Sequence, residues 1–597
     1  MSDLARAPTI ASPAKDLSTQ DWPWLKQYPA EVDWHRRYVP GPVHELLEQA
    51  VSRFPAHVCT NFLGRTMSYT EIGRAVDFAA AGLQRLGVAK GSKVGLFLPN
   101  SPTFIVAYYA VLKAGGTVVN FNPLYSLSEL AHQIRDSGTT LMITLDLKVL
   151  FGKVEQLIAE GALERAVVAS FSSLLPTLKS VLFRLARGQE IADIDGSPQR
   201  AKVVLQRELM ANDGRLAPVA IDPVTDIAVL QYTGGTTGTP KGAMLSHANL
   251  RANVEQISDC ASVLRDGQEI IIGILPLFHV FAMTGIMNLG IKKAMQIVLV
   301  PKFELGEAIR LMNHIRPTVL PGVPTLFNAI LNYKGSRKAD LSSLVWAVSG
   351  GAALPGEVKR GFEALTGAKL VEGYGLSETS PVATLNPPNG QLKDGSIGLP
   401  LPATYIAIRS VEDPLLEMPL GENGEICICG PQVMLGYWNN PKETAESFTS
   451  GPVLSSKGGG HYFRTGDIGH MDQDGYTFIS DRMKEMINSS GFKVYPRRIE
   501  EALYQHPAVE EAAVIGIPSE KRGEAPMAFV KLRVGQTATA EELLAFLTPK
   551  LAKMELPEAI EFRAKLPKTM IGKLSKKELK AEYLARAQTP SAKGSEP

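Results

Sequence analysis

Short apolar runs alternate with amphipathic stretches along most of this chain. Residues 93–98 and 116–120 have the length of buried strands, whereas residues 69–86 and 101–114 show the spacing of helices that bury one face. Alternation of strands and helices predicts an α/β fold with layered, largely parallel sheets. Beyond Tyr476 the chain becomes more charged and its elements shorter, which predicts a small α+β domain at the C-terminal end.

The length of 597 residues exceeds what one hydrophobic core usually supports, so at least two domains are expected. We expect a proline- and tryptophan-rich segment over residues 1–40 that wraps the first domain loosely. The large domain is expected over residues 41–483 and the small one over residues 484–585. Residues 586–597 have the composition of a disordered tail.

The stretch 270–291 contains no Asp, Glu, Lys or Arg and is long enough to cross a bilayer. Pro276, His279 and Asn288 interrupt it, however, and a proline breaks the helix that a membrane span requires. We therefore expect a buried strand over residues 270–275, a turn at Pro276 and a buried helix after it.

Residues 171–187 predict an amphipathic helix. Its apolar face carries Leu174, Leu178, Val181, Leu182 and Leu185. Lys179, Arg184 and Arg187 lie off that face. Such a helix can lie on an anionic membrane surface, but an ordinary helix that covers the core has the same pattern and is the favoured interpretation.

The global composition excludes little except nucleic-acid binding. Lysine and arginine total 62 against 60 acidic residues, so no basic field points to nucleic acid. The cysteines, Cys59, Cys260, Cys427 and Cys429, form no Cys-x-x-Cys pair, which predicts free buried thiols in a reducing compartment. Residues 1–16 lack the apolar core of a signal peptide, so a cytoplasmic location is expected. The oligomeric state stays open, with a homodimer as one possibility.

The segment 232–242 carries the strongest chemical signal in the chain. It reads Tyr-Thr-Gly-Gly-Thr-Thr-Gly-Thr-Pro-Lys-Gly and follows the apolar run 227–230. Glycines allow backbone amides to surround a phosphate, and Lys241 adds a positive charge suited to a polyphosphate. The segment is not of the Walker type, because no Gly-Lys-Ser or Gly-Lys-Thr triplet occurs. A flexible surface loop is the alternative.

This segment resembles the phosphate-binding signature of the acyl-adenylate-forming superfamily, which includes acyl-CoA synthetases, luciferases and the adenylation domains of peptide synthetases. Further motifs follow in the family's order, so the resemblance covers residues 45 to 585. It implies a large N-terminal domain with a β-barrel-like subdomain and a small, mobile C-terminal domain. It also implies that the loop binds ATP and that Thr236 helps to hold Mg²⁺. The implied phosphate-binding residues are Thr233, Gly234, Gly235, Thr236, Thr237, Gly238 and Lys241.

The other motifs supply the rest of the implied site. In segment 371–380 the resemblance implies that Tyr374 stacks on adenine next to Gly375, that Glu378 binds Mg²⁺, and that Thr379 lies beside the phosphates. In segment 349–354 the backbone of Gly351 and Ala352 is implied to approach the adenine and the acyl group.

Towards the C-terminal end, Asp467 and Arg482 match the residues that bind the ribose hydroxyls, although Arg464 and the glycines at 458–460 depart mildly from the ligase pattern. Lys573, in the segment 566–574, matches the lysine that enters the site for adenylation. The resemblance further implies a hinge at Lys484, a pantetheine channel next to Gly491, and a role for His279 in orienting acid and thiol.

The expected reaction requires positive charge around the phosphates and does not require a general base. A carboxylic acid is already ionised at neutral pH, so attack on the α-phosphate of ATP requires charge screening. The uncharged segments 270–291 and 321–327 favour an apolar acid. We therefore expect a long- or medium-chain fatty-acid–CoA ligase that uses ATP, Mg²⁺ and CoA. The alternatives are an acyl-AMP ligase that loads a carrier protein, an aryl-CoA ligase, and a non-catalytic acyl-adenylate or lipid sensor.

Overall fold

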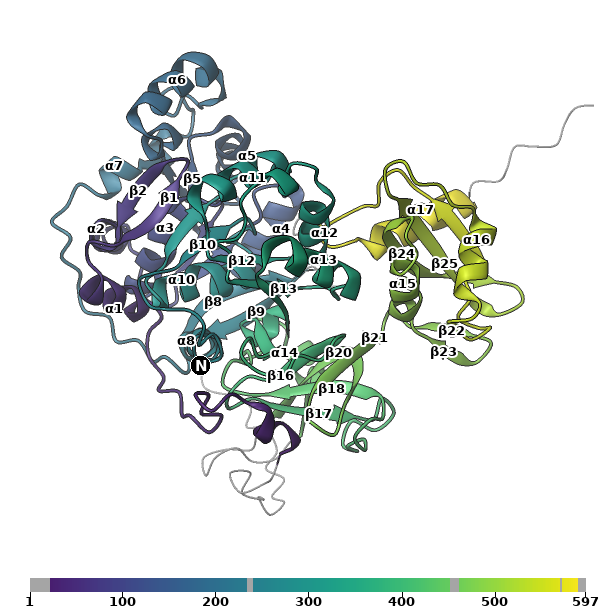
Figure 1. The fold of residues 1–597 in the computed structure, drawn as a ribbon. Helices are drawn as coiled ribbons and strands as arrows, with labels where there is room; N and C mark the ends of the chain where they lie inside the picture. Colours follow the sequence, from purple (N-terminus) through teal and green to yellow (C-terminus); the bar gives the residue numbers. More distant parts are fainter. Residues whose placement is uncertain (1–21, 234–239, 451–460, 570–571, 589–597) are drawn as a thin grey trace, which may run out of the picture.

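The structure is a computed structural model that describes residues 22–233, 240–450, 461–569 and 572–588. Figure 1 shows a large body of sheets and helices, a β-rich part below it, and a small domain to one side. The predicted mixture of layered sheets, barrel-like part and small α+β domain is confirmed.

The first sheet is built by the alternating strands and helices that the sequence predicts. Within the described residues it has seven strands, in the order β7-β6-β5-β3-β4-β8-β9, and only the β8–β9 pair is antiparallel. Its strands are β3 (Lys93–Leu96), β4 (Thr117–Asn120), β5 (Leu141–Leu145), β6 (Arg165–Ala169), β7 (Val203–Leu205), β8 (Ile227–Thr233) and β9 (Lys241–Ser246). β3 and β4 confirm the strands expected at 93–98 and 116–120. In the β8–β9 hairpin Thr233 lies opposite Lys241, so both ends of the phosphate-binding segment are held by one strand pair.

The second sheet joins a parallel half to an antiparallel half. Its order in the described residues is β17-β18-β20-β21-β16-β15-β14-β13-β12-β10-β11-β1-β2, with β19 paired to β20. The parallel half and its edge contain β1 (Val58–Phe62), β2 (Arg65–Ser68), β10 (Ile270–Gly273), β11 (Gln296–Leu299), β12 (Val319–Gly322), β13 (Trp346–Gly350) and β14 (Lys369–Gly375). The antiparallel half is β15 (Val382–Leu385), β16 (Ser396–Pro400), β17 (Tyr405–Arg409), β18 (Gly424–Cys429), β19 (Phe448–Ser450), β20 (His461–Met471) and β21 (Thr477–Arg482). This half is the β-rich part below the body in Figure 1.

Helices cover the faces of these sheets. They are α1 (Glu45–Arg53), α2 (Tyr69–Arg85), α3 (Pro102–Lys113), α4 (Leu127–Ser137), α5 (Lys148–Ala159), α6 (Thr177–Arg187), α7 (Gln206–Leu209), α8 (His247–Cys260), α9 (Val280–Ala282), α10 (Leu289–Lys292), α11 (Leu305–Ile315), α12 (Pro324–Asn332), α13 (Gly356–Thr366) and α14 (Pro441–Glu446). α2 begins with a capping box between Ser68 and Glu71, and the Ser101 side chain caps α3. Both helices confirm the periodicity of the sequence. The cysteines are buried with free thiols.

The apolar stretch 270–291 is part of the core. β10 is followed by a turn and then by α9, the π-helix η6 (Met283–Asn288) and α10, with almost every side chain buried. The expected strand, turn and buried helix are therefore confirmed. Among the described residues, no helix has the length and hydropathy needed to cross a membrane.

The N-terminal segment packs more tightly than the sequence suggested. The side chains of Trp22, Trp24 and Trp34 are buried in the core of the antiparallel half, together with Tyr374 and Tyr476. The expectation of a loose wrapping segment is therefore wrong for residues 22–34. Large aromatic side chains gain enough from burial to complete a neighbouring core, which composition alone does not reveal.

Helix α6 fits the favoured interpretation only in part, because it meets the core through the partly buried Phe183, which packs against Phe171, while its leucine face stays exposed. None of its residues is buried, and Leu178, Val181, Leu182 and Leu185 are 72%, 51%, 54% and 80% exposed. The helix projects from the top of the molecule in Figure 1. It is held by Arg184, which donates to the Ser172 hydroxyl, and by Lys179, which donates to the Leu63 carbonyl.

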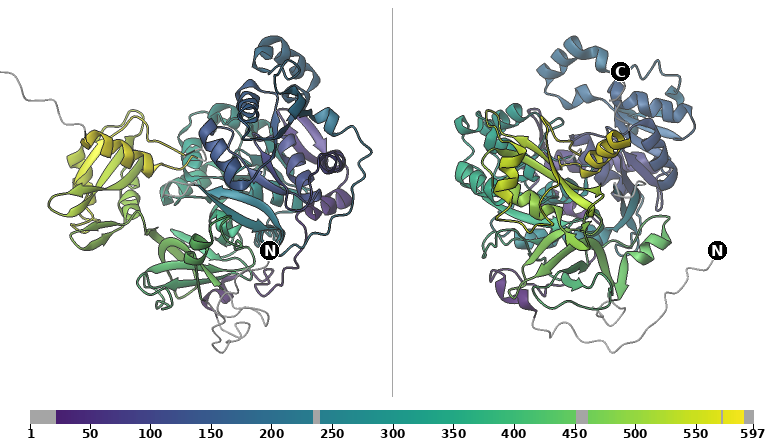
Figure 2. Two further views of the ribbon diagram at one scale, coloured as in Figure 1. Left: turned by 180° about the vertical axis from the view of Figure 1, so that it is seen from behind. Right: turned by 90° about the vertical axis from the view of Figure 1, so that its right-hand side faces the viewer.

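The small domain follows residues 483–486. It comprises β22 (Ile487–Ser489), β23 (Phe492–Val494), β24 (Val509–Ser519), β25 (Gly523–Leu532) and β26 (Ala559–Phe562), with α15 (Pro496–Tyr504), α16 (Ala540–Leu547) and α17 (Lys576–Gln588). It has hydrophobic clusters of its own. Figure 2 shows it beside the large body, on the side of α12 and α13.

Candidate active site

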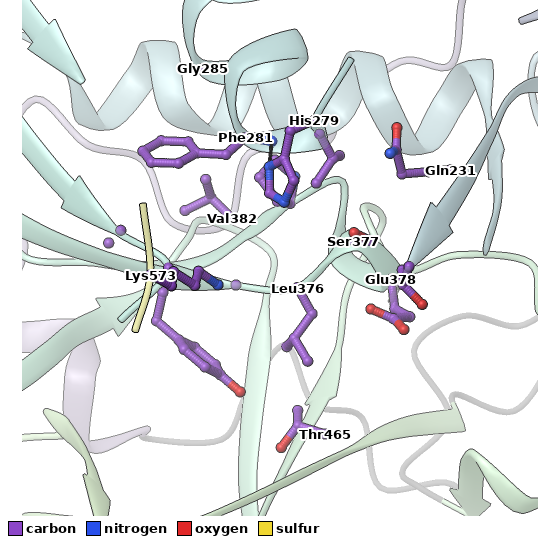
Figure 3. Close-up of a pocket in the computed structure, with 18 of the residues that line it drawn as sticks. Gln231, His279, Phe281, Gly285, Leu376, Ser377, Glu378, Val382, Thr465 and Lys573 are labelled. Atoms are coloured by element: carbon purple, nitrogen blue, oxygen red, sulfur yellow. Dashed lines mark hydrogen bonds between the residues drawn. The ribbon is translucent and has the colours of Figure 1, made fainter. Parts of the chain in front are cut away.

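A cavity of about 870 Å³ lies where the two sheets of the large domain and the small domain meet. Thr233 and Lys241 reach it from the β8–β9 hairpin, Arg482 from the end of β21, and Lys484 from the connection between the domains. Figure 3 shows Lys573 extending into the cavity, with His279 above it and Glu378 across from it. The structure thus brings together residues from motifs that are far apart in the sequence.

One end of the cavity is organised by Asp467. The Tyr374 hydroxyl donates to Asp467 Oδ2 over 2.7 Å, and Arg482 Nε lies 2.9 Å from Asp467 Oδ1. Asp467 faces Arg482 directly in the β20–β21 pair, so the ladder fixes their contact. Burial, and then the charge of Asp467, raise the pKa of Tyr374 well above its usual value, so the phenol stays protonated. This end is a rigid array of an aromatic ring, a carboxylate and a guanidinium.

The end of the cavity beside the predicted phosphate-binding segment carries both signs of charge. Lys241 forms an ion pair with Glu443 of α14, and its ammonium lies 5.4 Å from the centre of the Tyr437 ring. Glu378 lines the cavity and accepts a hydrogen bond of 2.7 Å from the Tyr437 hydroxyl. The predicted loop residues Gly234, Gly235, Thr236, Thr237 and Gly238 lie outside the described residues.

Lys573 is held in the cavity by a tight turn. Gly572 has φ +83°, which favours glycine, and its carbonyl accepts a hydrogen bond of 2.6 Å from Thr325 Oγ1 of α12. Gly351 also has φ +83°, which favours glycine, and a Cβ there would lie 2.5 Å from Lys573 Cε, so the lysine side chain packs directly against this backbone. Burial, and then the nearby Arg482, lower the pKa of Lys573 to about 8.

His279 is a neutral residue in this site. It lines the cavity at the start of α9, and its Nδ1 accepts a hydrogen bond of 3.3 Å from the Phe281 amide. Burial, and then the charge of Lys573, lower the pKa of His279 to about 3, so the imidazole is uncharged at neutral pH. An uncharged ring in the cavity can orient a carbonyl or a thiol by hydrogen bonding.

The other end of the cavity is apolar. Its wall is formed by η6 and its neighbours and by the parallel strands beneath them, and includes Leu275, Phe281, Leu289, Val319, Val323 and Trp346. The segments 270–291 and 321–327, expected to form the acyl pocket, both contribute to this wall.

Some predicted residues do not reach the cavity. Ala352 is exposed beside Gly351, and Gly491 is exposed in the turn between β22 and β23. The Thr379 hydroxyl donates to the Leu376 and Pro381 carbonyls and accepts from the Leu376 amide, so it serves its own turn. Asp467 lies behind Tyr374 and Arg482 and is itself buried. Their roles towards ATP and CoA stay predictions.

Other residues of the site were missed by the sequence reasoning. Gln231 and Thr465 line the cavity next to predicted residues, and Tyr437 and Glu443 contact Glu378 and Lys241. Tyr437 and Glu443 belong to the segment Gly-Tyr-Trp-Asn-Asn-Pro-Lys-Glu-Thr at 436–444. The Asn-Pro pair there marked a turn before a short helix, and it was the only local signal for this segment.

The fold and the cavity define a two-domain protein whose site is lined by the β8–β9 hairpin, by an apolar wall and by Lys573 of the small domain. Residues 47–438 match the AMP-binding enzyme family, and residues 498–573 match the C-terminal domain of the same enzymes. The chain therefore belongs to the AMP-binding enzyme family.

The comparisons with individual proteins agree with this membership. The chain is 42% identical over 564 residues to a long-chain-fatty-acid–CoA ligase of Bacillus subtilis, covering 94% of this chain and 98% of the relative. It is 36% identical over 567 residues to the enzyme of the same name from Escherichia coli, again covering 94% and 98%. Among solved structures, the ATP-bound MatB of Rhodopseudomonas palustris matches with a TM-score of 0.77 and 28% identity, covering 90% of this chain and 99% of MatB.

The pKa of Lys573 predicts an alkaline limit for adenylation. In its predicted role Lys573 must be protonated to neutralise developing charge, so kcat/KM for ATP in the adenylation step should fall as the pH rises through about 8. Pyrophosphate exchange measured from pH 6 to 10 would show this decline in kcat/KM. Lys573→Arg should move this decline in kcat/KM beyond the measured pH range, because a guanidinium does not titrate there. An unchanged decline in the Lys573→Arg variant would show that another group titrates near pH 8.

Proposed function

We propose that this protein is a fatty-acid–CoA ligase for long- or medium-chain acids, which forms acyl-AMP and pyrophosphate from ATP and then transfers the acyl group to CoA. The observation that carries the proposal is one cavity lined by Lys573, by Lys241 and Glu378 of two other motifs, and by an apolar wall. The long-chain ligases that are 36–42% identical over nearly the whole chain support it.

In the first step a carboxylate oxygen of the acid attacks the α-phosphorus, and the bond to pyrophosphate breaks. Lys573, Lys241 and Arg482 provide positive charge around the reacting groups, and the buried setting strengthens each interaction. Tyr374 offers an aromatic face for the adenine, and Arg482, which the buried Asp467 holds in place, lines the cavity for the ribose. In the second step the CoA sulfur attacks the acyl carbonyl carbon and AMP leaves, with neutral His279 available to orient the reacting groups.

Mg²⁺ fits the donor chemistry at the phosphate-binding end. Mg²⁺ in such enzymes is held by one or two carboxylates and by substrate phosphates, and Glu378 provides a carboxylate on the cavity wall. The bound ion would neutralise phosphate charge. The Tyr437 hydroxyl fixes the direction of the Glu378 carboxylate before any ligand binds.

Chain length is the direct test of this function. Each buried methylene contributes about 0.8 kcal/mol, so kcat/KM should rise steeply from acetate to saturated acids of increasing length until the apolar pocket is full. CoA-thioester formation should be measured across acetate, benzoate and this series. Equal use of benzoate would favour an aryl-CoA ligase, and acyl-AMP release without thioester would favour loading of a carrier protein.

We also propose that the enzyme acts at the cytoplasmic face of a membrane and contacts it through α6. Four apolar side chains of this helix are more than half exposed, and Lys179, Arg184 and Arg187 lie beside them. No acidic residue occurs between Phe171 and Gly188, so the segment suits an anionic surface. The exposed Leu63 also lies nearby, since Lys179 donates to its carbonyl. Long-chain acids partition into the same bilayer.

Replacing Leu178, Leu182 and Leu185 together by serine should lower binding to anionic vesicles at least about a hundredfold, since each buried leucine contributes about 1.5–3 kcal/mol. Sedimentation with phosphatidylglycerol vesicles measures this loss. The matched control replaces the exposed Leu415, Leu416 and Leu420 on the opposite end of the molecule by serine. An equal loss in the control, or a shift from dimer to monomer without loss of vesicle binding, would contradict the membrane role.

A further inference from the structure

One face of α12 contacts the small domain. Thr325, Asn328 and Asn332 are spaced at i, i+3 and i+7, so their side chains lie on the same side of the helix. Thr325 Oγ1 donates to the Gly572 carbonyl over 2.6 Å, and Asn328 Nδ2 donates to the Glu510 carbonyl over 3.0 Å. The opposite face carries Phe327, which packs edge-on against Phe362 in the large domain.

The two asparagines form a continuous relay between the domains. Arg533 Nη1 donates to Asn332 Oδ1 over 2.7 Å, and Asn332 Nδ2 donates to Asn328 Oδ1 over 2.7 Å. Asn328 then donates to the small domain at Glu510. The side-chain amide of each asparagine therefore both donates and accepts a hydrogen bond. The relay begins at Arg533 and ends at Glu510, both in the small domain. We call Thr325, Asn328, Asn332 and Arg533 the α12 latch.

The latch acts where Lys573 is positioned. Thr325 holds the residue immediately before Lys573, and Val323, just before α12, lines the cavity. While these bonds exist, the lysine side chain fills the space beside Gly351. The CoA sulfur must reach the same acyl carbonyl that Lys573 helps to activate, so the lysine has to leave between the two steps. Its departure with the small domain breaks the latch.

We infer that the α12 latch positions Lys573 for adenylation and that its strength sets the balance between the adenylating and the CoA-accepting states. This inference rests on the two-step reaction proposed above. The latch residues are positioning residues, because they act through Lys573 and the small domain. Weakening the latch disfavours only the state in which Lys573 is inside the cavity.

The test separates the half-reactions in full-length Arg533→Ala and Asn332→Ala. Both residues lie at the surface, so neither change disturbs a core. Each variant loses the hydrogen bond between the charged Arg533 and Asn332. Acyl-AMP formation, measured by pyrophosphate exchange, should therefore fall about tenfold in each variant. Transfer of supplied acyl-AMP to CoA should be unchanged or faster. The double variant should be no worse than Asn332→Ala alone, because that change already removes the Arg533–Asn332 bond.

Asn328→Ala is a second test of the latch, because it removes the middle residue of the relay. Asn328 is buried, so its folding should be checked by thermal unfolding, and its half-reactions should shift in the same direction. Matched controls are Arg586→Ala, which removes an ion pair with Glu561 inside the small domain, and the exposed Asn389→Ala, which removes a hydrogen bond to Ser262. Neither control should change the ratio of the half-reactions.

The outcomes separate the latch from the proposed function. If the wild-type protein forms no acyl-CoA from any acid, the proposed function fails. If the wild-type protein is active and Arg533→Ala slows both half-reactions equally, or slows neither, the latch is overturned. A changed ratio in the latch variants and an unchanged ratio in the controls would support it.

Discussion

Lys573→Ala should slow acyl-AMP formation about 10²–10³-fold, the usual cost of removing one donor from a preorganised charge-stabilising site. The same variant should convert supplied acyl-AMP and CoA to acyl-CoA at close to the wild-type rate, because Lys573 has to be outside the cavity at that step. Pyrophosphate exchange and single-turnover thioester formation measure the two steps separately. The loss should be confined to the first step.

The counterpart is Lys484→Pro. Lys484 lines the cavity in the connection between β21 and β22, and the resemblance to the family assigns it the hinge. Proline fixes φ near −65°, so a hinge residue that must change its dihedrals is blocked, and the variant should keep adenylation and lose thioester formation. Equal losses in both half-reactions, in either variant, would remove the claim that the small domain alternates between two states.

Glu378→Ala should abolish Mg²⁺-dependent adenylation almost completely, with an expected loss of about 10³-fold or more, because charge on the departing pyrophosphate would then lack its metal anchor. Thermal unfolding should change little, since Glu378 lies on the cavity wall and does not pack in a hydrophobic cluster. The measurement is pyrophosphate exchange as a function of Mg²⁺ concentration.

Tyr437→Phe provides the graded control. It removes only the hydroxyl that donates to Glu378 Oε1, so it should raise the Mg²⁺ concentration needed for half-maximal rate about tenfold and change the saturated rate much less. Near-normal exchange in a folded Glu378→Ala protein would remove Glu378 from the metal site, whatever Tyr437→Phe does.

The sequence by itself determined the class of fold and much of the cavity. Strands at 93–98 and 116–120 and helices at 69–86 and 101–114 could be predicted because their periodicity and caps are local properties of the chain. The apolar stretch 270–291 was correctly assigned to the core for the same kind of reason, since proline is incompatible with a continuous membrane helix. Lys241, Glu378 and Lys573 could be singled out because each lies in a short motif whose composition reflects its chemistry.

Only the tertiary structure decided which side chains meet. The Tyr437–Glu378 contact joins residues 59 apart, and the Lys241–Glu443 contact joins residues 202 apart, so no local pattern encodes either. The burial of Trp22 and Trp24 depends on a core built by strands from the far end of the large domain. Within the described residues, α6 meets the core through Phe183 and its leucine face stays exposed, although its sequence is that of a helix with one buried face. Only the folded chain determines which distant segments meet and which side chains find a packing partner. For that reason the sequence did not predict Tyr437 and Glu443 in the site, the burial of the tryptophans, or the exposed face of α6.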